Sequence, residues 1–205
     1  INNKSWEIIR IDLKDYSYLK SHVKISRYFK FKIFEILNKL NRNYDFVIYC
    51  DAFLSPKSDL DWDKIVDEAL KTDFPLLQYN HYYSKSIVDE MLAIVKCGKD
   101  TIENIEKLKR YLEFIDEGIN INQKQFYENT VLGYSLKNQN IINFLNNFWE
   151  YYISENNPSY RDQCLWNFMY LKYNRKAIII KSFRNKFNGK IKVRRKIEDY
   201  KKNIC

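Results

Sequence analysis

A short apolar run that ends in one carboxylate, Asp51, constrains the fold of this chain most strongly. Residues 44–56 read YDFVIYCDAFLSP, in which mainly β-forming residues lead up to Asp51. Because such a run is typical of a buried strand, we expect Asp51 at the carboxyl end of one. In open α/β sheets, ligands bind at that edge, and a carboxylate there can hold a divalent cation. The alternative is that Asp51 only caps the following loop.

The other apolar segments alternate between strand and helix patterns, which predicts an α/β fold. Strands are predicted over residues 6–13, 45–50, 74–79, 127–134 and 176–181. Helices are predicted over residues 25–40, from residue 59 onward, and over 86–97, 101–116, 138–155 and 159–173. We expect an open, mostly parallel sheet covered by helices on both faces. With 205 residues, of which 45% are hydrophobic, one domain spanning residues 1–181 is the simplest division.

The last part of the chain, residues 182–205, is a separate basic tail in this interpretation. It carries nine lysines and arginines against two acidic residues, which is +7 of the net charge of +9. Such a tail is suited to an anionic membrane surface, nucleic acid or an acidic partner, and a solvated end is the alternative. The four cysteines form no CxxC pair, no long apolar run is present, and the N-terminus does not resemble a signal peptide. We therefore expect a cytoplasmic protein, peripheral to a membrane if the tail binds one.

Four polar clusters join Asp51 as candidate site residues. Lys24, Arg27 and Lys30 are spaced by three on a predicted helix, so they lie near one face and could neutralise a diphosphate. His81 follows the strand predicted at residues 74–79. A solvated helix face and an incidental loop histidine are the alternatives.

The remaining two clusters carry carboxylates. Glu128 lies at the start of a predicted strand, where it could bind sugar hydroxyls or face water. Arg161, Asp162 and Gln163 open an otherwise apolar helix, and Asp162 could serve there simply as a cap for free backbone donors.

The order of these clusters resembles the GT-A glycosyltransferase fold, and most closely a small family of plant, bacterial and giant-virus proteins with a glycosyltransferase-like domain. The resemblance covers residues 5 to about 181, and its most specific part is the block from Tyr-Glu to Arg-Asp-Gln. The matching residues, in chain order, are Arg27 and Lys30, Asp51, His81, Asp89 or Glu90, Tyr127 and Glu128, Trp149, and Arg161, Asp162 and Gln163. Two departures are that Asp51-Ala52-Phe53 replaces the common Asp-x-Asp, and that the first βα unit of the family is missing, as in a fragment.

The resemblance implies transfer of a sugar from a nucleotide-sugar donor to a hydroxyl of a glycan, glycoprotein or lipid. Asp51, through Mn²⁺ or Mg²⁺, would stabilise the departing diphosphate together with Lys24, Arg27 and Lys30. Asp162 is the expected base, with Glu128 as the alternative base. His81, Arg161 and Gln163 would orient the sugar or the acceptor.

Two other functions remain open from the sequence. One is a basic module that binds nucleic acid through its tail and aromatic surface, although no recognised binding motif is present. The other is a transferase-like scaffold that binds a glycan without turnover. Salt-dependent DNA binding would favour the first of these, and metal-dependent hydrolysis of a nucleotide sugar would favour the transferase.

Overall fold

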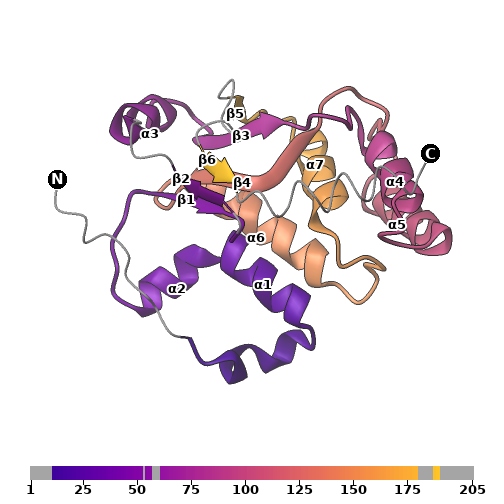
Figure 1. Ribbon diagram of the computed structural model, residues 1–205, viewed down its shortest axis with the longest axis horizontal. Helices are drawn as coiled ribbons and strands as arrows, with labels where there is room; N and C mark the ends of the chain where they lie inside the picture. The colour runs from indigo at the N-terminus through magenta and orange to yellow at the C-terminus, as the bar shows by residue number, and fades with distance from the viewer. Residues whose placement is uncertain (1–10, 53, 57–60, 180–186, 190–205) are drawn as a thin grey trace.

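The computed structural model describes residues 11–52, 54–56, 61–179 and 187–189, which form a mixed α/β fold (Figure 1). The helices are the 3-10 helix η1 (Leu13–Leu19) and the α-helices α1 (His22–Phe31), α2 (Ile33–Lys39), α3 (Trp62–Leu70), α4 (Ile87–Lys96), α5 (Ile102–Ile115), α6 (Gln139–Ile153) and α7 (Asp162–Lys172). The strands are β1 (Phe46–Cys50), β2 (Leu54–Pro56), β3 (Leu76–Asn80), β4 (Tyr127–Ser135), β5 (Ile178–Ile179) and β6 (Phe187–Gly189).

The main sheet has the strand order β1-β4-β3-β5 and is mostly antiparallel. The long strand β4 pairs antiparallel with both β1 and β3, and only β3 and β5 run parallel. The expectation of a mostly parallel sheet is therefore wrong. That expectation rests on the alternation of strand and helix along the chain. The alternation does not determine whether a strand runs parallel or antiparallel to its neighbours in the sheet.

Gly133 lies where β4 is held closely between its two neighbours. A Cβ atom at this position would be 3.0 Å from Phe46 Cε1 on β1 and 3.2 Å from Leu77 Cβ on β3. A larger residue would force the Phe46 or Leu77 side chain to shift, so glycine permits the close packing of these two side chains over β4.

Successive side chains of the sheet alternate between two hydrophobic layers, as expected for strands buried on both faces. Leu76, Leu132 and Tyr134 face the large layer, which also contains helices α1, α2 and α4–α7. Leu77 and Val131 face a smaller layer that is closed by Ala69 of α3. Figure 1 shows α3 on the opposite side of the sheet from α1 and α2. The prediction that helices cover both faces is thus confirmed.

Aromatic side chains join three helices in the large layer. Trp166 of α7 is fully buried, and its ring centroid lies 4.8 Å from that of Phe31 on α1 and 4.9 Å from that of Phe148 on α6. Aromatic pairs of this kind contribute about 0.5–1.5 kcal/mol beyond the burial of their area. They fix α1 and α7 beside each other, and these two helices supply most of the polar site.

Several helices begin with side-chain caps. Ser86 and Asp89 form a capping box at the start of α4, and the Asn138 side chain accepts from the Ile141 N–H at the start of α6. Gly98, which lies between α4 and α5, has a φ of +60°, a left-handed conformation that favours glycine. Asp89 thus serves in the N-terminal cap of α4.

Other segments differ from the prediction. The helix expected over residues 25–40 is interrupted at Lys32, whose side chain pairs with Glu35 and Asn146. Leu13, expected to end a strand over residues 6–13, instead begins η1, and residues 6–10 lie outside the described residues.

The predicted basic tail is described only at residues 187–189. These residues form β6, which pairs antiparallel with β2 in a second, two-stranded sheet. The rest of the predicted tail lies outside the described residues. Within the described part of the chain, no helix has both the length and the apolar composition needed to cross a membrane.

Candidate functional site

Helix α1 carries two cations, Arg27 and Lys30, toward the start of α7. Ile25, Tyr28 and Phe31 are buried on the core side of α1, so Arg27 and Lys30, three residues apart, share another face. Arg27 Nε lies 3.0 Å from Asp162 Oδ1, and Lys30 Nζ lies 3.3 Å from Asp162 Oδ2. One carboxylate thus binds both cations of α1.

Asp162 is almost completely buried, with 6% of its surface exposed. Burial alone would raise the pKa of its carboxyl, but Lys30, Arg27 and the hydrogen bonds that the carboxyl accepts together outweigh that effect, and the pKa falls to about 2. The Asn129 amide donates a further hydrogen bond to Asp162 Oδ2 at 3.2 Å. Because its pKa is low and three donors occupy its oxygen atoms, Asp162 is poorly suited to accept a proton, which argues against the expected role as the base.

Asp51 directly follows β1, as the apolar run predicts, and its backbone N–H donates to the Thr130 carbonyl of β4. The Tyr49 hydroxyl donates to Asp51 Oδ1 at 2.9 Å. Burial raises the pKa of the Asp51 carboxyl, although Lys30, the Tyr49 hydrogen bond and Arg27 act in the opposite direction. Asp51 therefore binds protons more strongly than Asp162 does.

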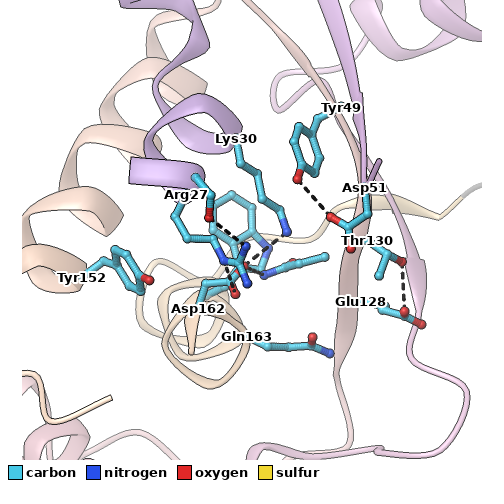
Figure 2. A network of polar contacts seen from close by, with 12 residues as sticks. Arg27, Lys30, Tyr49, Asp51, Glu128, Thr130, Tyr152, Asp162 and Gln163 are labelled. Carbon is cyan, nitrogen blue, oxygen red and sulfur yellow. Dashed lines mark hydrogen bonds and ion pairs between the residues drawn. The ribbon is translucent and has the colours of Figure 1, made fainter. Parts of the chain in front are cut away.

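Asp51 and Asp162, far apart in the sequence, line the same pocket of about 300 Å³. Figure 2 shows Arg27 and Lys30 reaching from α1 toward Asp162, with Asp51 across from them beside Thr130. The full lining consists of Val23, Arg27, Lys30, Asp51, Asn129, Thr130, Tyr160, Arg161, Asp162 and Gln163. The pocket therefore gathers residues from α1, the end of β1, the start of β4 and the start of α7.

Arg161 and Gln163 are the lining residues whose polar groups are left unmatched. Arg161 Nε and Gln163 Nε2 are buried and have no hydrogen-bond partner among the described residues. A buried donor without a partner costs about 1–3 kcal/mol. A ligand with acceptor oxygen atoms would recover this free energy once the two side chains turn these nitrogens toward the pocket that they line.

Glu128 lies beside this pocket and does not line it. The Thr130 hydroxyl, which does line the pocket, donates to Glu128 Oε1 at 2.9 Å (Figure 2). Glu128 also acts electrostatically on His81, in a second polar cluster. The position of Glu128 next to the pocket is compatible with the role of an alternative base.

His81 follows β3, as predicted, but lies in this second cluster and not among the lining residues. Its Nδ1 accepts from the Ser84 N–H at 2.8 Å, and its Nε2 lies 3.9 Å from Glu90 Oε2. Burial lowers the pKa of His81 despite the neighbouring Glu90 and Glu128. With Nδ1 accepting in this way, His81 stabilises the loop after β3.

Lys24 does not join Arg27 and Lys30 at the pocket. Its Nζ donates to the Ile153 carbonyl at the end of α6 at 3.3 Å. This contact satisfies a free carbonyl at a helix C-terminus, where a cation is favourable. The expectation that Lys24 binds the diphosphate is not supported by this position.

Asn129 also lines the pocket, although the sequence does not single it out as a site residue. It is buried, accepts from Gln78 Nε2 at 2.8 Å and donates to Asp162, so it connects β3 to α7. The available signal was a polar amide in the middle of a strand whose later residues are apolar, because a buried amide requires partners.

The residues around Asp51 do not fit a divalent metal ion well. Of the two carboxylates that line the pocket, Asp162 is bound to Arg27 and Lys30, which leaves Asp51 as the one available to a metal ion. The same two cations also lie near Asp51 and would repel a metal ion. No group of three or more His, Cys, Asp or Glu side chains arranged to hold a metal ion is found in the described parts of the chain. Metal sites in proteins usually combine several such ligands, so we derive no step through Mn²⁺ or Mg²⁺.

No family model matches the chain, and searches of curated proteins and of solved structures found no match either.

Proposed function

We propose that the pocket binds a nucleotide sugar and that the protein transfers the sugar to a hydroxyl group of a glycan, glycoprotein or lipid. One observation carries this proposal. Three cations, Arg27, Lys30 and Arg161, and two carboxylates, Asp51 and Asp162, come from separate elements to line one small polar pocket. Cations suit a phosphate, and carboxylates and amides suit sugar hydroxyls.

The cations have an electrostatic role in the proposed reaction. The acceptor oxygen bonds to the anomeric carbon while the bond from that carbon to the diphosphate oxygen breaks, and the diphosphate leaves with the electron pair. Fixed positive groups in a partly desolvated pocket stabilise this developing negative charge. Arg161, which lines the pocket and has no ion-pair partner among the described residues, is the cation free for this role, while Arg27 and Lys30 are held in place by Asp162.

Asp51 replaces Asp162 as the proposed base for a reaction that inverts the anomeric centre. Its carboxylate lines the pocket, and burial raises its pKa, which makes it the stronger base of the two. The proton of the acceptor hydroxyl would pass to Asp51. Glu128, beside the pocket, is the alternative acceptor of this proton.

A second candidate is a protein that binds a glycan or nucleotide sugar without turnover. The observation that favours it is the double ion pair of Asp162, which places one of the two pocket carboxylates in a structural role. Both candidate functions require binding of the ligand, but only the transferase converts it to product. A nucleic-acid function would depend on the predicted tail, most of which lies outside the described residues.

The test uses the whole chain, the common nucleotide sugars and their nucleoside diphosphates. Binding is measured by calorimetry and turnover by release of nucleoside diphosphate, each with and without Mn²⁺. We expect saturable binding of at least one nucleotide sugar, and slow hydrolysis of that sugar in the absence of an acceptor.

Asp51→Asn is the informative variant, and Asp67→Asn, on the exposed side of α3, is the matched control. Asp51→Asn should lower turnover at least about 100-fold, the lower end of the range for a general base, while Asp67→Asn should leave it unchanged. Saturable binding without hydrolysis or transfer would favour the non-catalytic candidate. Absence of binding to every nucleotide and nucleotide sugar would refute both.

A further inference from the structure

We propose that Arg161 and Gln163, and not the cations of α1, directly hold the phosphoryl group of the ligand, while Arg27 and Lys30 position Asp162. This inference rests on the proposed function for the identity of the ligand. It reassigns Arg161 and Gln163 from the sugar or acceptor to the phosphate, and it names a phosphorylated sugar as the class of compound that the pocket recognises.

The first step of the argument is the charge balance of the pocket. Both cations of α1 bind the Asp162 carboxylate, at 3.0 Å for Arg27 Nε and 3.3 Å for Lys30 Nζ. Lys30 is only 3% exposed, so little of its ammonium remains for a ligand. These two charges are therefore largely committed within the protein.

The second step is the contrast with Arg161. No ion pair joins the Arg161 guanidinium to a carboxylate among the described residues, and its buried Nε lacks a hydrogen-bond partner there. Arg161 is consequently the cation of the pocket whose charge is not neutralised by a direct contact. A planar guanidinium that is not bound to a carboxylate matches the oxygen atoms of a phosphate.

The third step concerns Gln163, whose buried Nε2 is also without a partner among the described residues. Arg161 and Gln163 flank Asp162 in the sequence, and both line the pocket. Two unmatched N–H donors, one of them charged, require a ligand group with several acceptor oxygens and a negative charge. A phosphoryl group meets both requirements, whereas a neutral sugar hydroxyl meets only the first.

The fourth step is the position of these residues at the start of α7. Arg161 is the N-cap residue of this 11-residue helix, and it makes no side-chain capping hydrogen bond. The partial positive charge of a helix N-terminus favours an anion at this place. It adds to the effect of Arg161 in the same direction.

The test compares Arg161→Met with Arg110→Met, in which the substituted arginine is exposed on α5 away from the pocket. Gln163→Leu has Gln123→Leu, in an exposed turn, as its control. Binding of pyrophosphate, glucose 1-phosphate and unphosphorylated glucose is measured by calorimetry on the whole chain. Thermal unfolding of each variant shows whether it is folded.

We expect Arg161→Met to weaken binding of pyrophosphate and glucose 1-phosphate at least about 10-fold, as for loss of a charge-assisted hydrogen bond. Gln163→Leu should weaken it less, and both control variants should bind as the unmodified protein does. Arg161→Lys should recover part of the affinity, because it keeps the charge and loses the planar fork. The melting temperature should not fall, because Arg161→Met removes a buried N–H without a partner and no described side chain forms a hydrogen bond or ion pair with the Arg161 guanidinium.

The outcomes separate this inference from the proposed function. Phosphate binding that depends on Arg161, with no turnover of any nucleotide sugar, would support the inference and argue against transfer. Turnover of a nucleotide sugar whose KM is unchanged in Arg161→Met would leave the transfer function standing and overturn the inference. Failure of the unmodified protein to bind pyrophosphate or glucose 1-phosphate would also overturn it.

Discussion

Arg27 Nε and Asp162 Oδ1 lie 3.0 Å apart and connect α1 to the first residue of α7. The Arg27 side chain is 29% exposed and that of Asp162 only 9%, so the pair lies at the border between core and pocket. Lys30 approaches the same carboxylate from the buried side. The start of α7, which carries the other polar residues of the pocket, is thereby fixed against α1.

Replacing Asp162 with asparagine should destabilise the protein strongly. Asp162→Asn retains the shape but leaves the buried Lys30 ammonium without its counter-charge. Removing one partner of a buried ion pair typically costs about 3–5 kcal/mol. Because Arg27 is partly solvated, we expect a loss toward the lower end of that range in the free energy of unfolding, measured by urea titration at about pH 7.

The control for this variant is Asp67→Asn, which removes a carboxylate from an exposed helical position. Its free energy of unfolding should change by less than about 0.5 kcal/mol. Equal effects of the two substitutions would show that the ion pairs of Asp162 do not contribute to stability.

The same carboxylate should make stability depend on pH in the acidic range. The folded-state pKa of Asp162 is about 2, against an ordinary value of 3.8. A depressed folded pKa means that the contribution is fully present above the unfolded pKa and is lost as the pH falls through the folded pKa. The stability difference between the unmodified protein and Asp162→Asn should therefore shrink between about pH 5 and about pH 2, by roughly 2–3 kcal/mol. Urea titrations over this range measure it, and a difference independent of pH would contradict the assignment.

Much of the element structure could be predicted because its signals are local. The strand before Asp51 and the helices α4 and α5, separated by Gly98, were recognised from apolar periodicity and turn residues, which act over a few neighbouring positions. The break at Lys32 was missed because it contains neither proline nor glycine. It depends on contacts of Lys32 with Glu35 and with Asn146, a residue distant in the sequence.

The direction of β4 was not predictable in the same way. A buried strand is an apolar run whether it pairs parallel or antiparallel with its neighbours. The pattern of residues 127–135 therefore does not indicate the direction of β4 in the sheet. Its antiparallel pairing with both β1 and β3 joins segments that are distant in the sequence, which a local pattern does not encode. For the same reason, the sequence predicts which residues contribute to the candidate pocket but not how they are arranged in space. The structure alone shows that Lys24 binds the end of α6 and that Asn129 binds Asp162.

A buried polar network behind the pocket should be sensitive to removal of Gln78. Its Oε1 accepts from Trp166 Nε1 at 3.0 Å and from the Tyr170 hydroxyl at 2.6 Å, and its Nε2 donates to Asn129 Oδ1 at 2.8 Å. Gln78→Leu would leave these groups buried without that partner, at about 1–3 kcal/mol for each unsatisfied group. We expect a loss of at least about 2 kcal/mol in the free energy of unfolding.

Gln123→Leu, in an exposed turn, is the matched control and should have little effect. The Trp166 fluorescence of Gln78→Leu should also change in its folded state, because the indole N–H loses its acceptor. A variant as stable as the unmodified protein would mean that the network contributes nothing net.

Asp51→Asn should have the opposite effect on stability from Asp162→Asn, although both remove a carboxylate from the same pocket. Burial raises the pKa of Asp51, so its charged form is disfavoured in the folded protein. A raised folded pKa gives a stability contribution that is present below the unfolded pKa and is lost as the pH rises through the folded pKa. At about pH 7, the neutral asparagine avoids this cost, and Asp51→Asn should be at least as stable as the unmodified protein. Urea titration of the two variants at the same pH measures the contrast in the free energy of unfolding. A loss of stability in Asp51→Asn as large as that in Asp162→Asn would show that the Asp51 carboxylate stabilises the fold and is not kept in the pocket at a cost in stability.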